Sequence, residues 1–234
     1  MFARGSVLAR GTARGRRTSG RVLDRPSAHL IVGRTPAAAR ILVAGASGVL
    51  GRRVTRRLVA MGSEVTGVAR SAAGADLVRG LGASARVCDV FDATGLRRLL
   101  LEVRPTVVIH ELTDLPDDPA LVGSFASRNA RMRRVGTRNL IDAARAAGVE
   151  RLMVESVAWD LGGDARLAVE DMEDVVIDAG GTVLRYGQLY GEGTYWPDSL
   201  PPAPRVHVEA AAERTVDALG ASTSIVLIAE SQCA

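Results

Sequence analysis

Lysine is absent from this 234-residue chain, and each of its 30 basic residues is an arginine. Aromatic residues are also scarce, at 3% of the chain, so aliphatic side chains must fill the core. No apolar run approaches the roughly 18 residues that suggest a membrane-spanning helix, and the sequence therefore predicts no membrane partner. The two cysteines, Cys88 and Cys233, show no CxxC spacing and accompany no secretory signal, which favours reduced thiols in a cytoplasmic protein.

The positive charge of the chain is concentrated at its start. The formal net charge is +4, yet residues 1–40 hold nine arginines and a single acid, Asp24. The remaining sequence has 21 basic and 25 acidic residues, so it is mildly acidic. A domain that binds nucleic acid would carry clustered basic charge on its folded part. The sequence therefore predicts no nucleic-acid partner for the folded domain.

Residues 1–39 are rich in arginine, glycine and serine and show no sustained apolar period. Such a segment cannot bury enough apolar surface to offset its chain entropy, so we expect a disordered extension or translation from an upstream start codon. Two other interpretations stay open, namely an organellar transit peptide, because the segment is acid-poor, and a tail that binds nucleic acid. In each case we expect one folded domain over residues 40–234.

From residue 41 onward, apolar β-type runs alternate with segments of helical periodicity, a pattern typical of βαβ units. Strands are expected at residues 41–44, 64–69, 85–88, 106–110, 151–155, 182–185 and 224–229. Helices are expected at residues 50–61, 73–80, 93–103, 130–147, 167–179 and 209–219, with a proline-rich loop at 187–204. This order predicts an α/β fold with a doubly wound, mostly parallel sheet of the Rossmann type.

The first strand runs directly into the sequence Gly-Ala-Ser-Gly-Val-Leu-Gly at residues 45–51. Gly45 lets the chain turn off the strand, Gly48 removes a Cβ where a pyrophosphate approaches, and Gly51 lets the helix pack close to the sheet. The amides at the start of the helix then face the phosphates, together with the positive end of the helix dipole. The sequence therefore predicts a dinucleotide site that also includes Ser47, Val49 and Leu50.

The residue that follows the second strand indicates which dinucleotide binds. About 20 residues beyond the glycine turn, an acid would bind the ribose 2′-hydroxyl of NAD(H). This chain has Arg70 there and no acid beside it, and an arginine pairs well with the 2′-phosphate of NADP(H). We therefore expect NADP(H) in preference to NAD(H). The alternative is that Arg70 is one more solvated arginine.

These features resemble the extended short-chain dehydrogenase/reductases, also called the NAD-dependent epimerase/dehydratase family, over about residues 39–230. The glycine turn matches the turn of the family, and Asp89, which ends the third predicted strand, looks like its adenine-contacting acid. Residues 107–110 resemble the family's fourth strand, and the residues that follow this strand line the cofactor. The resemblance thus implies further cofactor contacts from Asp89, Val90 and Leu112.

The catalytic part of the resemblance is incomplete. The family uses a Ser or Thr after the fifth strand with a Tyr-x-x-x-Lys pair on the next helix, where the lysine lowers the pKa of the tyrosine. Ser156 matches the serine, but Ala165 and Val169 stand where the tyrosine and the lysine would be. A phenol near its unperturbed pKa of about 10 needs such a partner to exchange protons at neutral pH. The usual acid–base chemistry is therefore absent.

Three side chains near the predicted strand ends are candidates to replace the missing proton donor, namely His110, Glu111 and Glu155. Downstream, the substrate region is reduced to a short insertion, in which Glu192, Tyr195, Trp196 and Asp198 line a small pocket or belong to a surface loop anchored by the tryptophan. An acidic loop offers a weak cation site, but a solvated turn is favoured and no metal is expected; its carboxylates are Asp114, Asp117 and Asp118.

The sequence as a whole predicts an NAD(P)(H)-binding protein whose oxidoreductase or epimerase chemistry is altered. Its expected partners are the dinucleotide, an unidentified small-molecule substrate and, in a homodimer, a second copy of the chain. The alternative is a non-catalytic NADP(H)-sensing regulatory module, like the redox sensors of nitrogen metabolite repression. Oxidation of NADPH by a panel of carbonyl compounds would favour the enzyme, and tight binding without turnover would favour the sensor.

Overall fold

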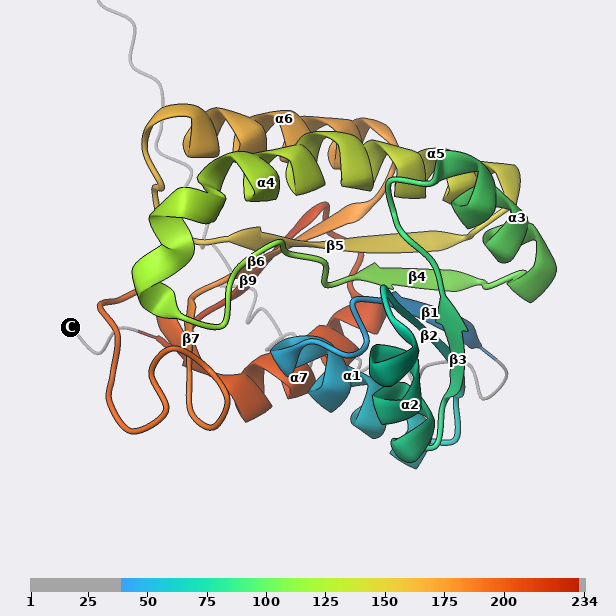
Figure 1. Cartoon of the computed structure of the whole chain (residues 1–234), viewed down its shortest axis with the longest axis horizontal. Helices are drawn as coiled ribbons and strands as arrows, with labels where there is room; N and C mark the ends of the chain where they lie inside the picture. Colours follow the sequence, from blue (N-terminus) through green and yellow to red (C-terminus); the bar gives the residue numbers. More distant parts are fainter. Residues whose placement is uncertain (1–38, 232–234) are drawn as a thin grey trace, which may run out of the picture. The chain divides into compact units, whose positions relative to one another are not determined.

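The computed structural model describes residues 39–231, and within this range a seven-stranded sheet forms the centre of the fold (Figure 1). The strands lie in the order β3-β2-β1-β4-β5-β6-β9, and every neighbouring pair is parallel. This is the predicted doubly wound Rossmann arrangement. The strands are β1 (Arg40–Ala44), β2 (Glu64–Ala69), β3 (Ser84–Val87), β4 (Val107–His110), β5 (Arg151–Val157), β6 (Thr182–Tyr186) and β9 (Ile225–Ile228).

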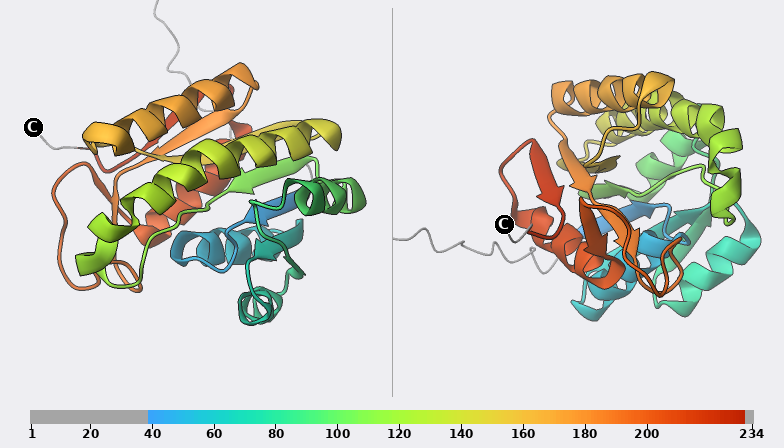
Figure 2. Two further views of the ribbon diagram at one scale, coloured as in Figure 1. Left: turned by 45° about the horizontal axis from the view of Figure 1, so that its top comes forward. Right: turned by 90° about the vertical axis from the view of Figure 1, so that its left-hand side faces the viewer.

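Helices cover both faces of the sheet, as the end-on view in Figure 2 shows. In β1, Ile41 and Val43 belong to a core cluster with residues of α1, α2 and α7, whereas Leu42 and Ala44 pack in a second cluster with residues of α3, α5 and α6. Burial on both faces explains why the strands read as continuous apolar runs. The helices are α1 (Val49–Ala60), α2 (Ala72–Gly80), α3 (Ala93–Val103), α4 (Ala126–Arg131), α5 (Thr137–Ala146), α6 (Gly163–Asp178) and α7 (Val208–Asp217).

The strand order reverses between β1 and β4. The chain progresses outward from β1 through β2 to β3 and then returns to the other side of β1 with β4. The connections after β1 and β4 leave toward opposite faces, which opens a crevice outside the carboxyl ends of these strands. The register pairs Ala44 with both Val68 and His110, so the residues that follow β1, β2 and β4 meet at this edge.

The helix predicted at residues 130–147 starts earlier and is less regular than expected. A 3-10 helix at Pro119–Phe125 leads into α4, and a π-helical segment at Met132–Gly136 separates α4 from α5. Asp118 caps the 3-10 helix by accepting a hydrogen bond from the amide of Ala120 at 2.9 Å. The first turns were missed because their Ser, Arg and Asn residues carry little apolar periodicity.

The predicted loop at residues 187–204 contains a short strand. β7 (Gln188–Tyr190) pairs in parallel with β8 (Arg205–His207) in a separate two-stranded sheet. Three-residue strands are too short to show an alternating pattern, so the sequence did not reveal them. The intervening residues 191–204 form turns and bends, as expected.

No helix in the described range is both long and apolar enough to cross a membrane. The expected disorder concerns residues 1–39, of which residues 1–38 lie outside the part of the chain that the structure describes. The domain start near residue 40 stays a prediction.

Candidate dinucleotide-binding site

Two glycines of the turn after β1 are required by the packing of the protein itself. Gly45 has φ +88°, and a Cβ there would lie 2.5 Å from the carbonyl oxygen of Glu111. A Cβ on Gly51 would overlap the carbonyl oxygen of Gly45, so α1 could not pack this close to the turn. Both positions therefore fix the path of the chain.

Gly48 is less crowded by the described part of the protein than Gly45 and Gly51 are. It is exposed, and an added Cβ would meet only the carbonyl oxygen of Gly45, at 3.2 Å. Its backbone angles, φ −72° and ψ 171°, are open to any residue. A Cβ would thus make one tight contact with the turn itself, and the exposed backbone of Gly48 also leaves room for a bound group.

The start of α1 is open to an anion. Gly48 occupies the N-cap position, no described side chain caps the helix, and its first turn contains no acid. The side chain of Leu50 is buried, so the predicted contribution of this residue comes from its backbone amide. Ser47 and Val49 are half-buried beside the turn. Free amides and the positive end of the helix dipole together suit a pyrophosphate.

The end of β2 holds Arg70 in a cluster around a buried carboxylate. Asp114 is 6% exposed and accepts hydrogen bonds from Arg70 at 3.2 Å and from Arg128 at 3.1 Å through each of two nitrogens. The predicted solvated turn is therefore wrong for Asp114. Because Arg128 alone holds both carboxylate oxygens, Arg70 can turn to another anion without leaving Asp114 unpaired.

A cavity of about 220 Å³ lies beside this cluster, and its lining residues are Arg70, Asp89, Phe91, Asp114, Arg128 and Arg131. Arg131 stacks its guanidinium 3.9 Å from the centre of the Phe91 ring. The cavity thus carries three guanidinium groups and two carboxylates. Arg128 and Arg131 were not predicted. Their spacing of three residues places them on one helix face, but the predicted helix began at residue 130.

The other predicted cofactor contacts lie next to this cavity. Asp89 is exposed and accepts a hydrogen bond from the amide of Phe91 at 2.9 Å. Val90 is buried, and its carbonyl oxygen accepts a hydrogen bond from Asn139. Leu112 is half-buried after β4. Of these three residues, Asp89 is the one with a polar side chain at the cavity, and its other carboxylate oxygen has no hydrogen bond within the described residues.

His110 lies at the end of β4, and both of its ring nitrogens are occupied. Nδ1 accepts a hydrogen bond from the amide of Leu112 at 3.1 Å, so the proton is on Nε2, which lies 3.1 Å from the hydroxyl of Thr137. Burial lowers the pKa of His110 to about 4, and the ring is neutral near pH 7. This geometry leaves no nitrogen free for a substrate.

Ser156 is fully buried, and its hydroxyl donates a hydrogen bond to Glu173 on α6 at 2.5 Å. Glu173 also forms an ion pair with Arg185. The serine hydroxyl therefore forms part of a charged cluster, with Glu173 and Arg185, between the sheet and α6. The predicted role of orienting a substrate would require it to leave this cluster.

Glu111 takes part in a buried chain of hydrogen bonds. The Tyr186 hydroxyl lies 2.9 Å from Oε1 of Glu111 and 2.7 Å from the hydroxyl of Thr215, which in turn lies 2.7 Å from the carbonyl oxygen of Ala211. The Tyr186 hydroxyl donates to Glu111, and this hydrogen bond by itself lowers the pKa of the Glu111 carboxyl group. Burial, with the nearby charge of Glu155, raises the pKa of Glu111 to about 8.

This pKa makes stability depend on pH. The folded protein holds the Glu111 proton up to about pH 8, whereas the unfolded chain releases it near the ordinary value of 4.5. Between these values the folded state binds more protons, so the free energy of unfolding should fall as pH rises, by up to about 1.4 kcal/mol per unit. Urea unfolding from pH 5 to pH 9 should show this slope, and Glu111→Gln should reduce it. The exposed Glu102→Gln is the control, and equal slopes in all three proteins would refute the assignment.

Glu155 and the two positions of the missing pair complete the site. Glu155 is 7% exposed, its Oε1 has no hydrogen-bond partner in the described structure, and burial raises the pKa of its carboxyl group. Ala165 and Val169 lie on α6 and are half-buried. Neither carries a polar group, so α6 supplies no proton donor at the expected place.

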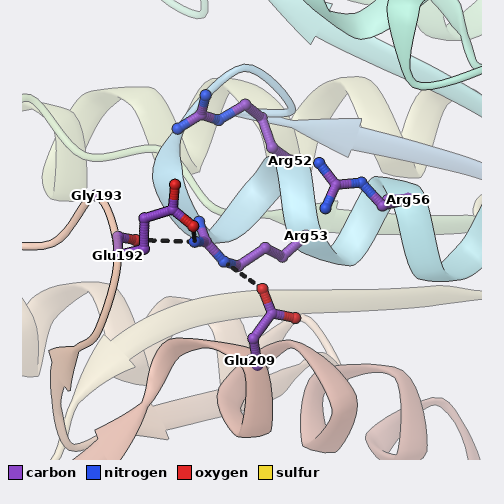
Figure 3. A pocket seen from close by; sticks show the side chains of 6 residues that line it. All are labelled: Arg52, Arg53, Arg56, Glu192, Gly193 and Glu209. Atoms are coloured by element: carbon purple, nitrogen blue, oxygen red, sulfur yellow. Dashed lines mark hydrogen bonds and ion pairs between the residues drawn. The ribbon is translucent and has the colours of Figure 1, made fainter. Parts of the chain in front are cut away.

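A second hollow lies between α1 and α7, and Figure 3 shows its lining by Arg52, Arg53, Arg56, Glu192, Gly193 and Glu209. Arg53 donates to Oε1 of Glu209 and to the carbonyl oxygen of Glu192, each at 2.8 Å. These bonds hold the loop after β7 and the start of α7 against α1. The expected anchoring role of Trp196 is not seen, because this side chain is 37% exposed.

Comparison with known proteins identifies the family. The pattern of the NAD dependent epimerase/dehydratase family matches residues 41–158, just over half of the chain. The chain therefore belongs to the NAD-dependent epimerase/dehydratase family, whose members are dinucleotide-binding and oxidoreductase-like, as the sequence predicts.

Among individual proteins, the 3-diazoavenalumate denitrifying reductase of a Streptomyces species is 37% identical over 182 residues. This alignment covers 66% of the chain and 58% of the relative, so the chain spans less than two thirds of the relative's length.

Solved structures show the same fold. The UDP-glucose 4-epimerase of Thermus thermophilus, in complex with NAD, superposes with a TM-score of 0.68 at 21% identity, covering 81% of this chain and 77% of that chain. The UDP-glucose 4-epimerase of Thermotoga maritima, with UDP-glucose, gives 0.67 at 17% identity, covering 81% and 76%. At such identities the similarity establishes the fold alone.

Proposed function

We propose that the chain binds NADP(H) across the carboxyl ends of β1 and β4 and transfers hydride to a substrate that needs no proton from the protein. The observation that carries this proposal is that the chain keeps the dinucleotide-binding turn but has apolar residues where the family has the catalytic tyrosine and lysine. Gly48 leaves its backbone open to a phosphate, whereas Ala165 and Val169 remove the acid and the base. The chain thus keeps the residues that bind the cofactor in this family but lacks the residues that transfer the proton.

The preference for NADP(H) is supported by the cavity at the end of β2. A 2′-phosphate would enter between Arg70 and Arg128, and it would add two negative charges to a site that holds three guanidinium groups and two carboxylates. NADH would bring no charge to this place. The stacking of Arg131 on Phe91 further indicates a flat surface that suits an adenine ring.

Arg70→Ala should therefore weaken NADPH binding about 10- to 100-fold while sparing NADH, because a charge-assisted hydrogen bond contributes about 1.5–3 kcal/mol. Calorimetric titration of both cofactors measures the two affinities. Arg79→Ala, which removes an exposed arginine of α2 paired with Asp76, is the matched control and should change neither. Equal losses for NADPH and NADH would rule out the 2′-phosphate contact.

The substrate class follows from what a site without the Tyr-x-x-x-Lys pair can do. The Streptomyces relative is, by its name, a reductase that denitrifies a diazo compound, and the ending of its substrate's name denotes a carboxylate. Reduction of an aryl diazonium ion adds hydride to the carbon that bears the diazonium group. Bound NADPH would supply this hydride and be oxidised to NADP⁺, while the C–N bond would break with both of its electrons leaving on N₂. The new C–H bond uses the hydride alone, so no tyrosine or lysine is needed.

The reaction is tested by NADPH oxidation with benzenediazonium, with release of N₂ and benzene measured against the protein-free reaction. Turnover in step with N₂ release supports the proposal. Tight NADPH binding with no turnover above background would favour the alternative, a non-catalytic NADP(H)-sensing module. Absence of NADPH binding would contradict both.

A further inference from the structure

Two buried ionisable side chains each have a polar atom that lacks a hydrogen-bond partner in the described part of the protein. Arg133, in the π-helical segment, is 4% exposed, and its Nε has no hydrogen-bond partner. Glu155, near the end of β5, is 7% exposed and has an unpartnered Oε1. Leaving a buried charge without a partner costs several kcal/mol, so a feature like this calls for a ligand or a functional reason.

The two side chains do not satisfy each other. The charge of Arg133 lowers the pKa of Glu155, so the groups are within electrostatic range. However, no nitrogen of Arg133 lies within 4.0 Å of a carboxylate oxygen among residues 39–231. Arg133 and Glu155 therefore do not form an ion pair with each other.

Both groups belong to the edge of the sheet where the cofactor is proposed to bind. Glu155 follows Val154, which pairs with His110 at the end of β4. The His110 ring contacts Thr137 at the start of α5, and Arg133 precedes Thr137 by about one helical turn. The helix that carries Arg133 runs over this end of β5 (Figure 1). π-helical segments such as Met132–Gly136 are rare and often mark functional sites.

The guanidinium of Arg133 indicates which ligand fits. Arg133 is buried and pairs with no carboxylate among residues 39–231, and a planar carboxylate matches the guanidinium fork. Burial raises the pKa of Glu155, which favours the form that can donate a hydrogen bond.

We propose that Arg133 binds a carboxylate of the substrate and that Glu155 donates a hydrogen bond to the same group. This inference rests on the proposed function, since it names how a hydride acceptor is held next to the nicotinamide. Ala165 and Val169 supply no polar group from α6 at these two positions. Arg133 and Glu155 then select for an acid among aryl substrates.

The test uses cinnamate and its neutral analogue cinnamamide, titrated calorimetrically into the full chain saturated with NADP⁺. Arg133→Met should weaken cinnamate about 10- to 100-fold, as expected for loss of a charge-assisted hydrogen bond, and leave cinnamamide unchanged. Arg134→Met is the matched control, because Arg134 is the next residue of the same segment but pairs with Asp164 and Asp171 at the surface. This control should bind both probes like the parent.

A second readout separates binding from structure. In the absence of ligand, Arg133→Met replaces an unpartnered buried charge, so its Tm should stay level or rise by about 2–4 °C. If Arg133 were a structural ion-pair residue, the Tm would fall instead.

The inference is overturned if the parent does not bind cinnamate, if Arg133→Met binds it equally well, or if the Tm of this variant drops. With normal NADPH binding, any of these results contradicts the inference alone. Failure of the parent to bind NADPH would instead contradict the proposed function.

Discussion

Aldehydes and ketones are expected to react slowly on this chain, with NADPH consumed about 10²- to 10⁴-fold more slowly than by an enzyme that has the Tyr-x-x-x-Lys pair. Hydride addition to a carbonyl group leaves negative charge on oxygen, and a general acid must deliver a proton as that charge forms. The corresponding positions hold Ala165 and Val169, which have no proton to give.

Ser156, His110 and the tyrosines are not placed to take over this task. The hydroxyl of Ser156 is bonded to Glu173, and His110 is neutral with both nitrogens occupied. The three tyrosines of the chain are hydrogen-bonded elsewhere, and the pKa of each is raised, by burial for Tyr186 and Tyr195 and by the Glu230 carboxylate for Tyr190. A raised pKa makes a phenol a weaker acid.

The initial rate of NADPH oxidation with benzaldehyde, compared with benzenediazonium, measures the contrast. Benzaldehyde should stay near the protein-free rate, and benzenediazonium should exceed it. Ser156→Ala should leave both rates unchanged if the protein stays folded, because this hydroxyl faces Glu173. A kcat near 10 per second on benzaldehyde, typical of a working enzyme, would show that the proton donor has been overlooked.

Gly48→Val is expected to weaken NADPH more than about 100-fold, equivalent to about 2.7 kcal/mol. The branched side chain would occupy the space through which the pyrophosphate reaches the first amides of α1. The backbone angle φ of −72° is open to any residue, but a Cβ would lie 3.2 Å from the Gly45 carbonyl oxygen, so the turn must shift slightly. Calorimetric titration of NADPH gives the affinity, and thermal unfolding confirms that the variant is folded.

Gly80→Val provides the matched control for this substitution. Gly80 ends α2, and an added Cβ there would meet nothing within 4 Å. The control should bind NADPH like the parent. If Gly48→Val also did so, the cofactor would have to bind somewhere other than the glycine turn.

The regular part of the fold was predictable because local pattern and tertiary structure agree there. β2 and α3 have the predicted bounds, since Glu64–Ala69 is an uninterrupted β-type run and Pro105 stops the helix Ala93–Val103. The glycine turn was predictable for the same reason, because its backbone requirements are local. The 3-10 helix and the π-helical segment were not, since neither has a distinctive sequence period.

The chemistry of the site was less predictable, because it depends on partners distant in sequence. Whether His110 or Ser156 is free for a substrate is decided by Thr137 and Glu173, 27 and 17 residues away. The raised pKa of Glu111 depends on its burial and on Glu155, which belongs to β5. No local pattern contains this information.

Isotope labelling decides whether the product hydrogen comes from the cofactor or from a proton on the protein. Reduction of an aryl diazonium salt by NADPH deuterated at C4 of the nicotinamide should place deuterium on the carbon that carried the diazonium group. This deuterium should come from only one face of the nicotinamide ring. The same reaction with unlabelled NADPH in D₂O should place none there. Direct hydride transfer in this site would be contradicted if the enzymatic product took its new hydrogen from D₂O. It would also be contradicted if the hydrogen came equally from both faces of the nicotinamide ring.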